Sequence, residues 1–185
     1  MFDGAKHIVH SLSGLGKTGY YVSCDYGTQN ATVFLLWCRD KEGKWICCRE
    51  YYHSGRDGGG QKTDAEYADD LKEWLDGIEP LKIIIDPAAA SFIAELKKRK
   101  YKTKKAKNDV LDGIRYVASL LSLEKIGIYE KCTHTLEEFA SYIWDEKASQ
   151  RGEDKPVKQR DHCADAVRYF CYTVIRRPEG ITILK

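Results

Sequence analysis

The chain has 185 residues, of which 43% are hydrophobic and 31% are charged, so it has the composition of a globular protein with one full core. Its net charge of +2 falls short of the strongly basic profile of a dedicated nucleic-acid-binding protein, so any such contact must depend on local clusters of charge. No apolar run approaches the ~20 residues of a membrane span and no signal peptide is visible, so we expect no membrane association.

The seven cysteines are an odd number, include no C-x-x-C motif and lie mostly inside apolar segments. We expect them to be reduced, buried thiols of a cytoplasmic protein. Cys132 and His134 lie close together, but no second pair stands at the spacing of a zinc site, so we expect no zinc.

Residues 1–19 are weakly patterned, and we expect a flexible leader or linker remnant there. The segment Ser13–Thr18 reads SGLGKT, which invites comparison with a phosphate-binding loop. That loop requires G-x-x-x-x-G-K-[ST] after a strand and before a helix. Ser11 stands at the first glycine position and a strand follows, so the sequence does not predict a nucleotide site.

Three segments rich in Val, Ile, Phe, Trp and Tyr predict β-strands over residues 20–25, 31–39 and 44–52. The short polar turns between them predict an antiparallel meander. Residues 55–61 contain four glycines and two charged residues, and we expect a mobile loop there.

Helix signals begin at Thr63, which forms the sequence pattern of a capping box with Glu66. The apolar run over residues 81–85 predicts a buried parallel strand, which Asp86 and Pro87 end. Beyond this strand we expect a helix over 91–100 capped by Ser91, a short strand within 101–107, a helix from Asn108 and a strand over 125–129. A second capping box at Thr135 and Glu138 predicts the next helix. The expected remaining segments are a loop over 147–159, a helix from Asp161 and a tail over 177–185. The pattern indicates an α/β fold, with a mixed sheet flanked by helices, in one domain over residues 20–176.

Acidic residues follow two of the predicted strands. Asp25 ends the first strand and Asp86 follows the buried one, so the two meet at one sheet edge if these strands are neighbours. The last helix could place Asp165 and His162, which are three residues apart on one face, over that edge. Such oxygen-rich clusters suit Mg²⁺ or Mn²⁺, and two such ions can activate a water and stabilise the leaving oxygen in phosphodiester cleavage.

Each of these residues also has a structural interpretation, and spacing alone does not choose between the two. Asp25 could be a turn residue, Asp86 could form an Asx-type turn, and Asp165 could lie on a solvated helix face. Asp161 is expected at the N-cap of the last helix. Close carboxylates also repel one another, so a metal-free cluster should favour protonation or disorder.

Several segments stand in a recognisable order between residues 20 and 175. They are Cys24–Gly27, Tyr51–Tyr67, Ile85–Ile93, Asp112–Ile114, Glu138–Trp144 and Asp161–Tyr169. In this order and at this spacing they resemble the C-terminal nuclease domain of the large terminase subunit of tailed bacteriophages, which has the ribonuclease-H-like fold.

The resemblance implies that Asp25, Asp86 and Asp165 are catalytic metal ligands, with His162 beside them and two Mg²⁺ or Mn²⁺ ions as cofactors. Asp161 could replace Asp165 as ligand from one turn away. The implied activity is endonucleolytic cutting of concatemeric phage DNA before and after headful packaging, in the host cytoplasm. Double-stranded DNA is the implied substrate, and the terminase small subunit and the portal are implied partners of a longer protein that also carries the packaging ATPase.

The densest basic run lies between Lys97 and Lys107. It could be a solvated helix end, or it could contact DNA phosphates without reading sequence. The candidate DNA-binding residues are Arg56, Lys62, Lys104, Lys105 and Lys107. Two alternatives to the terminase function stay open, namely another ribonuclease-H-like nuclease such as a junction resolvase, and a non-catalytic module that docks DNA or protein.

Overall fold

The computed structural model describes residues 2–16, 19–27, 30–56, 60–141 and 161–176 of the chain. In these residues seven strands form one sheet in the order β1-β7-β4-β3-β2-β5-β6. The strands are β1 (Ile8–Val9), β2 (Tyr21–Asp25), β3 (Ala31–Arg39), β4 (Trp45–Ser54), β5 (Lys82–Ile85), β6 (Thr103–Lys105) and β7 (Ile126–Tyr129). The helices are α1 (Gly4–His7), α2 (Asp64–Leu75), α3 (Ala90–Lys98), α4 (Val110–Ser122), α5 (Thr133–Ser141) and α7 (His162–Phe170), which continues as the π-helix η2 (Cys171–Ile175).

The centre of the sheet is the antiparallel meander that the sequence predicts, with β3 between β2 and β4. β5 joins β2 in parallel, β6 joins β5 in parallel, and β7 joins β4 in parallel. Short turns suffice for the antiparallel pairs, whereas β5, β6 and β7 are each reached through a helix. The predicted α/β class and mixed sheet are confirmed.

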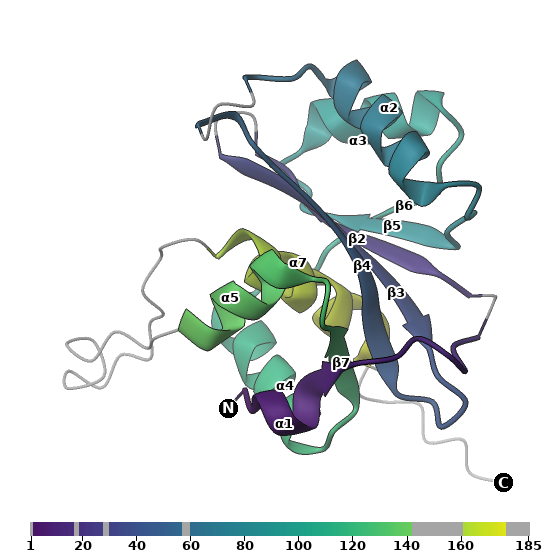
Figure 1. The fold of residues 1–185 in the computed structure, drawn as a ribbon. Helices are drawn as coiled ribbons and strands as arrows, with labels where there is room; N and C mark the ends of the chain where they lie inside the picture. Colours follow the sequence, from purple (N-terminus) through teal and green to yellow (C-terminus); the bar gives the residue numbers. More distant parts are fainter. Residues whose placement is uncertain (1, 17–18, 28–29, 57–59, 142–160, 177–185) are drawn as a thin grey trace, which may run out of the picture.

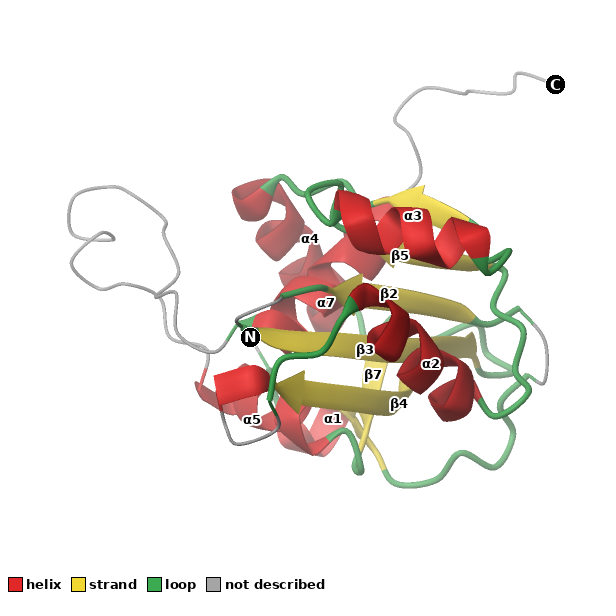
Figure 2. Cartoon of the chain, turned by 90° about the horizontal axis from the view of Figure 1, so that it is seen from above, coloured by secondary structure: helices red, strands yellow, loops and turns green. Residues whose placement is uncertain are grey.

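Helices cover both faces of the sheet: α2 and α3 lie on one face, and α4, α5 and α7 lie on the other (Figure 1; Figure 2). Because side chains alternate along a strand, Phe34 and Leu36 of β3 pack toward α2 and α3, whereas Leu35 and Trp37 pack toward α7. Trp37 stacks on Phe170 of α7 with ring centroids 4.3 Å apart, and both side chains are fully buried. This contact fixes α7 against the sheet.

Helix starts confirm the N-cap positions predicted at Thr63 and Asp161 and contradict two other capping predictions. Thr63 and Glu66 form the predicted capping box of α2. Ser91 does not cap α3, because that helix begins at Ala90 and Ser91 lies inside its first turn. The second capping box is also wrong, because α5 begins at Thr133 and the Glu138 carboxylate binds the start of another helix.

The prediction of a flexible leader is wrong for residues 4–9. Asp3 caps α1, β1 pairs in parallel with β7, and His7 is buried with Nε2 at 2.9 Å from the carbonyl oxygen of Leu121. The predicted domain limits at residues 20 and 176 stay predictions. The predicted loop over 147–159, the tail over 177–185 and part of the 55–61 loop lie outside the described residues.

All seven cysteines are buried and none is in a disulfide, as expected from their apolar surroundings. None of the helices in the described part of the chain combines the length and the apolar character that a membrane span requires.

Candidate active site

Asp25 and Asp86 lie at neighbouring positions on one edge of the sheet. Asp25 is the last residue of β2, and Asp86 directly follows β5. The two strands run parallel and pair Cys24 with Ile85, so the two aspartates come next in the same register. The carboxyl ends of neighbouring parallel strands share one edge, which is a frequent place for ligand binding in α/β sheets.

Helix α7 lies against this edge and binds both aspartates. Nδ1 of His162 lies 2.9 Å from Oδ2 of Asp25. Further along the helix, the hydroxyl of Tyr169 donates to Oδ2 of Asp86 at 2.8 Å. Oδ1 of Asp86 accepts from the amide of Ala88 at 2.7 Å, so the Asx-type turn considered from the sequence is present as well.

Asp165, the third predicted ligand, is held by an arginine of the same helix. Its Oδ1 accepts from Nη2 and Nε of Arg168 at 2.8 and 3.1 Å. Arg168 is only 4% exposed and also donates to the carbonyl oxygen of Asn108 at 3.1 Å. Asp165 is therefore on the helix that covers the site, but its carboxylate is already paired with a buried cation.

Burial and like-charge repulsion oppose the ionisation of Asp25 and Asp165. Burial raises the pKa of Asp25, and the carboxylates of Asp161 and Asp86 raise it further. Burial also raises the pKa of Asp165, with smaller contributions in the same direction from Asp25 and Asp161. Asp25 therefore lies close enough to Asp86, Asp161 and Asp165 for like-charge repulsion to act between the carboxylates.

His162 offsets part of this repulsion. Its hydrogen bond to Asp25 is the largest cause that raises the pKa of the His162 imidazole. The same hydrogen bond opposes the rise in the pKa of Asp25. A protonated His162 thus favours the ionised form of the carboxylate that ends β2.

The donor chemistry of this cluster fits a hard divalent cation. Carboxylate oxygens are the preferred ligands of Mg²⁺ and Mn²⁺, and a cation would relieve the repulsion described above. Within the described ranges, however, no three His, Cys, Asp or Glu side chains already form a group that could hold one ion. At Asp165 the guanidinium of Arg168 binds Oδ1, so a cation at this carboxylate would bind Oδ2 or compete with the arginine.

Of the predicted DNA-binding lysines of the basic run, Lys104 and Lys105 lie in β6, the strand next to β5, and Lys107 follows it. Lys105 of β6 pairs with Ile85, so Lys107 lies just beyond the same edge of the sheet as Asp86. Both lysines are exposed. Nζ of Lys104 donates to the carbonyl oxygen of Thr173 at 3.4 Å. The sheet therefore brings Lys105 and Lys107 toward the acidic edge.

The other two predicted DNA-binding residues come from the segment before α2. Lys62 forms an ion pair with Asp70 of α2. Arg56 is exposed just after β4, whose last residue Ser54 pairs with Ala31, the first residue of β3. Arg56 thus follows the end of β4 that lies at the same end of the sheet as the C-terminus of β2.

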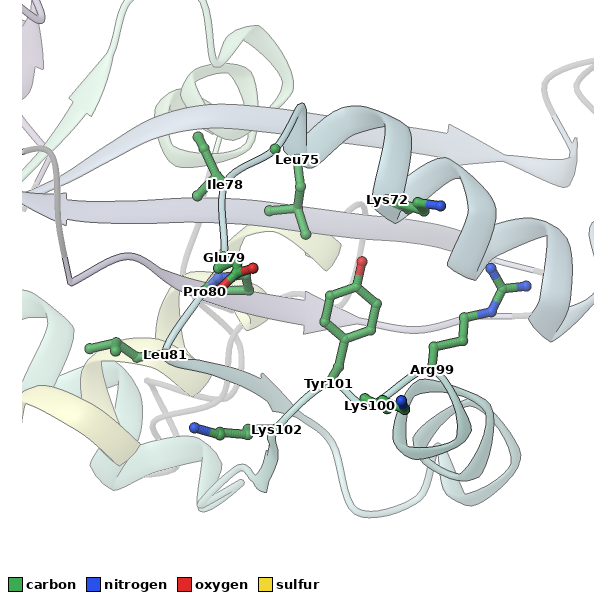
Figure 3. A pocket seen from close by; sticks show the side chains of 11 residues that line it. Lys72, Leu75, Ile78, Glu79, Pro80, Leu81, Arg99, Lys100, Tyr101 and Lys102 are labelled. Carbon is green, nitrogen blue, oxygen red and sulfur yellow. The ribbon is translucent and has the colours of Figure 1, made fainter.

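A cavity of 690 Å³ lies at the opposite end of β5 (Figure 3). It is formed by the end of α2, the segment leading into β5 and the residues that follow α3, and its lining includes Lys72, Leu75, Leu81, Arg99 and Tyr101. These residues precede or flank the start of β5, whereas the aspartates follow the ends of β2 and β5. The cavity is therefore separate from the acidic edge.

Comparisons with known proteins show which sequences and folds this chain resembles. No protein-family model matches the chain. The large terminase subunit of Escherichia phage T5 is 29% identical over 123 residues, which are 63% of this chain and 27% of that protein. The solved nuclease domain of the P22 large terminase has a TM-score of 0.73 at 16% identity, over 92% of this chain and 89% of that one. The large terminase of a thermophilic bacteriophage, solved in complex with ADP, is 50% identical with a TM-score of 0.89, over 94% of this chain.

The chain resembles the nuclease domain of the large terminases. The resemblance inferred from the sequence and the ribonuclease-H-like fold are confirmed. The nuclease domain of the large terminase from bacteriophage SPP1, solved with bound manganese, has the same fold, with a TM-score of 0.62 at 17% identity over 88% of this chain and 94% of that one. The chain spans 44% of the ADP-bound thermophilic phage terminase, less than half of its length.

Two residues of this terminase-like domain that touch the predicted ligands were not singled out from the sequence. Arg168 and Tyr169 bind Asp165 and Asp86, respectively. The spacing of three between Asp165 and Arg168 is a helical pairing signal that could have identified the arginine. Nothing in the local sequence connects Tyr169 to Asp86, because that contact depends on how α7 lies across the sheet.

Gly113 of α4 allows the buried Arg168 side chain to pass. A Cβ added at this glycine would lie 2.7 Å from Cγ and 2.8 Å from Cδ of Arg168. Gly113→Ala gains about 1 kcal/mol of helix propensity, but overpacking costs roughly 1–3 kcal/mol. We expect the cost of the clash to exceed the gain in helix propensity, because the Arg168 guanidinium is bound to Asp165 and Asn108 and cannot easily move away. Gly113→Ala should therefore lower the free energy of unfolding in urea titrations. The control is Ser119→Ala on the exposed face of α4, and a Gly113→Ala variant as stable as that control would contradict the prediction.

The buried Glu138 should make stability depend on pH. Burial raises the pKa of Glu138 from 4.5 to about 7, so the folded state holds a proton that the unfolded state has released. The free energy of unfolding should therefore fall as pH rises through this window, by at most about 3 kcal/mol for this group. Glu138→Gln lacks the titration, so we expect it to gain stability relative to the parent between about pH 5 and about pH 8 in urea titrations. Parallel pH profiles for the two proteins would show that Glu138 ionises normally.

Proposed function

We propose that this chain is the nuclease domain of a phage large terminase, a divalent-metal-dependent endonuclease that cuts concatemeric double-stranded phage DNA during genome packaging. The observation that carries the proposal is the pairing of β2 with β5, which brings Asp25 and Asp86 to one edge beneath α7. The 50% identity to a phage large terminase over 94% of the chain supports the same assignment.

In this proposal Asp25 and Asp86 hold the metal, and Asp165 completes the ligand set from α7, with Asp161 as the alternative. Two Mg²⁺ or Mn²⁺ ions, when bound, supply Lewis-acid charge that activates a water and stabilises the leaving oxygen. The manganese bound in the SPP1 nuclease domain supports a divalent cation for this fold. The mutual repulsion of the aspartates supports it independently, because a cation removes the cost of keeping them ionised.

The surrounding residues orient the ligands and the substrate. His162 favours the ionised form of Asp25, and Tyr169 fixes the orientation of Asp86 through its hydroxyl. Lys105 and Lys107 contact backbone phosphates, which positions a duplex without reading its sequence. Arg56, Lys62 and Lys104 extend this contact in the proposal.

The proposal extends to the protein of which the domain is a part. The chain spans 44% of the ADP-bound thermophilic phage terminase, so we place it within a longer subunit that acts in the host cytoplasm. The terminase small subunit and the portal are the proposed partners of that complete protein.

The test is digestion of supercoiled plasmid DNA by the purified chain with Mn²⁺, with Mg²⁺ and with a chelator. We expect nicked and linear products with either cation and none with the chelator. A four-way junction offered in parallel distinguishes a resolvase, which would prefer the branched substrate. No cleavage of any substrate, together with no Mn²⁺ binding by calorimetry, would favour a non-catalytic docking module instead.

A further inference from the structure

Two glutamates on the α7 side of the sheet bind helix starts that belong to other segments. Glu50 of β4 accepts hydrogen bonds from the amides of His134 and Thr135, at 3.1 and 2.7 Å, in the first turn of α5. Glu138 of α5 accepts from the amide of Ala164, at 2.9 Å, in the first turn of α7. The two carboxylates therefore connect β4 to α5 and α5 to α7.

The contact from Glu138 takes the place of a local cap. Asp161 occupies the N-cap position of α7 and is a preferred capping residue, but its side chain makes no capping hydrogen bond. The first amides of a helix have no partner within the helix, so a buried helix start needs an acceptor from elsewhere. Glu138, which is 6% exposed, is such an acceptor.

The carboxylate of Asp161 is thereby left available at the acidic edge. It contributes to the raised pKa of both Asp25 and Asp165, which requires a position close to both. The first turn of α7 also carries His162, whose ring binds Asp25. The residues that Glu138 fixes are thus the ones that face the proposed metal ligands.

We propose that Glu138 is a positioning residue of the nuclease site. By capping α7 from α5 it fixes His162 against Asp25 and leaves the Asp161 carboxylate free to face the acidic cluster. The inference rests on the proposed function, because it concerns the same site.

The alternative is that Glu138 only stabilises the helix start. A buried glutamate is an unfavourable helix cap, because burial raises its pKa to about 7 and so disfavours its charged form at neutral pH. Asp161 could cap the helix without that cost, since its side chain is at the N-cap and only partly buried. The arrangement therefore supports a role of Glu138 in positioning α7, and not only in stabilising its first turn.

The test compares Glu138→Ala and Glu138→Gln with Asp40→Ala. Asp40 is the control, because its carboxylate likewise accepts from backbone amides, in this case two at 2.9 Å each, in the turn between β3 and β4. For Glu138→Ala we expect the Mn²⁺ affinity, measured by calorimetry, and the kcat of plasmid nicking to fall roughly 10-fold or more, with the KM for DNA unchanged. Glu138→Gln keeps an acceptor oxygen and should stay within about threefold of the parent, as should Asp40→Ala.

A second readout needs neither metal nor DNA. The nitrogen NMR signals of the His162 ring report its hydrogen bond to Asp25, and we expect Glu138→Ala to shift them and Asp40→Ala to leave them unchanged. Unshifted His162 signals, or parental Mn²⁺ affinity and nicking in Glu138→Ala, would overturn the positioning role. A parent protein that neither binds Mn²⁺ nor nicks DNA would refute the proposed function instead, and the His162 signals would then decide the positioning role alone.

Discussion

Asp25→Asn and Asp86→Asn are each expected to nick supercoiled plasmid at least about 100-fold more slowly than the parent, because a lost ligand carboxylate removes several kcal/mol of transition-state stabilisation. Asparagine has nearly the size of aspartate and keeps an acceptor oxygen for His162 or Tyr169. Burial raises the pKa of Asp25, so a neutral side chain at this position should not destabilise the metal-free fold. The measurement is the initial nicking rate with Mn²⁺ at saturating enzyme.

Asp40→Asn is the control for this pair, because Asp40 lies at the end of β3 that is remote from the acidic edge. It should nick DNA at the parental rate. Asp165→Asn is a less clear test, since it removes the charge that pairs with the buried Arg168 and can destabilise the protein through that cation. Parental rates for both Asp25→Asn and Asp86→Asn would mean that the strand-end aspartates do not carry the chemistry.

Removal of the Phe170 ring should cause the largest loss of stability. Phe170 is fully buried, stacks on Trp37 and packs edge-on against Trp45 with ring centroids 5.0 Å apart. Truncation of such a ring typically costs about 3–5 kcal/mol, so we expect Phe170→Ala to lower the free energy of unfolding by that amount in urea titrations. Because the ring anchors α7, its removal should also weaken the hydrogen bond between His162 and Asp25.

Phe92→Ala is the matched variant on the other face of the sheet. Phe92 of α3 is equally buried and stacks on Tyr26 at 4.6 Å, but α3 carries no residue of the candidate site. Both variants should lose similar stability. At a temperature at which both are folded, we expect only Phe170→Ala to bind Mn²⁺ more weakly. Equal Mn²⁺ affinities in the two folded variants would show that the anchoring of α7 does not control the site.

The central part of the fold follows from local sequence patterns. The β-branched and aromatic segments and the short turns predict the meander, and the nearly unbroken apolar run at 81–85 predicts a buried parallel strand. The juxtaposition of Asp25 and Asp86 could be predicted because it needs only the neighbourhood of two strands whose ends are marked by Gly27 and Pro87.

Features that depend on contacts between distant elements could not be predicted in the same way. Thr135 and Glu138 have the spacing of a capping box, yet Thr135 binds Glu50 of β4 and Glu138 binds the start of α7. A local pattern cannot indicate that a better partner comes from another segment. The packing of residues 4–9 was missed for the same reason, since a strand of two residues has too little pattern of its own and depends on β7.

The residues of α7 show where prediction from the sequence ends. Periodicity separates the buried Cys163, Val167 and Phe170 from the face that carries His162 and Asp165. It does not show that Arg168, whose charge would suggest an exposed position, is 4% exposed and bound to Asp165. A buried ion pair depends on the partner that the fold brings near, and here Gly113 makes the room for it.

The most direct test is a crystal of the chain soaked in Mn²⁺ and examined for anomalous scattering. The proposal predicts a peak between the carboxylates of Asp25 and Asp86, within about 2.0–2.6 Å of an oxygen of each. It also predicts that a carboxylate oxygen of Asp165, or of Asp161 in its place, completes the ligand set. Anomalous peaks only at other sites, with Asp25 still bound to His162 and Asp86 still bound to Tyr169, would contradict the assignment of this edge as a metal-dependent nuclease site.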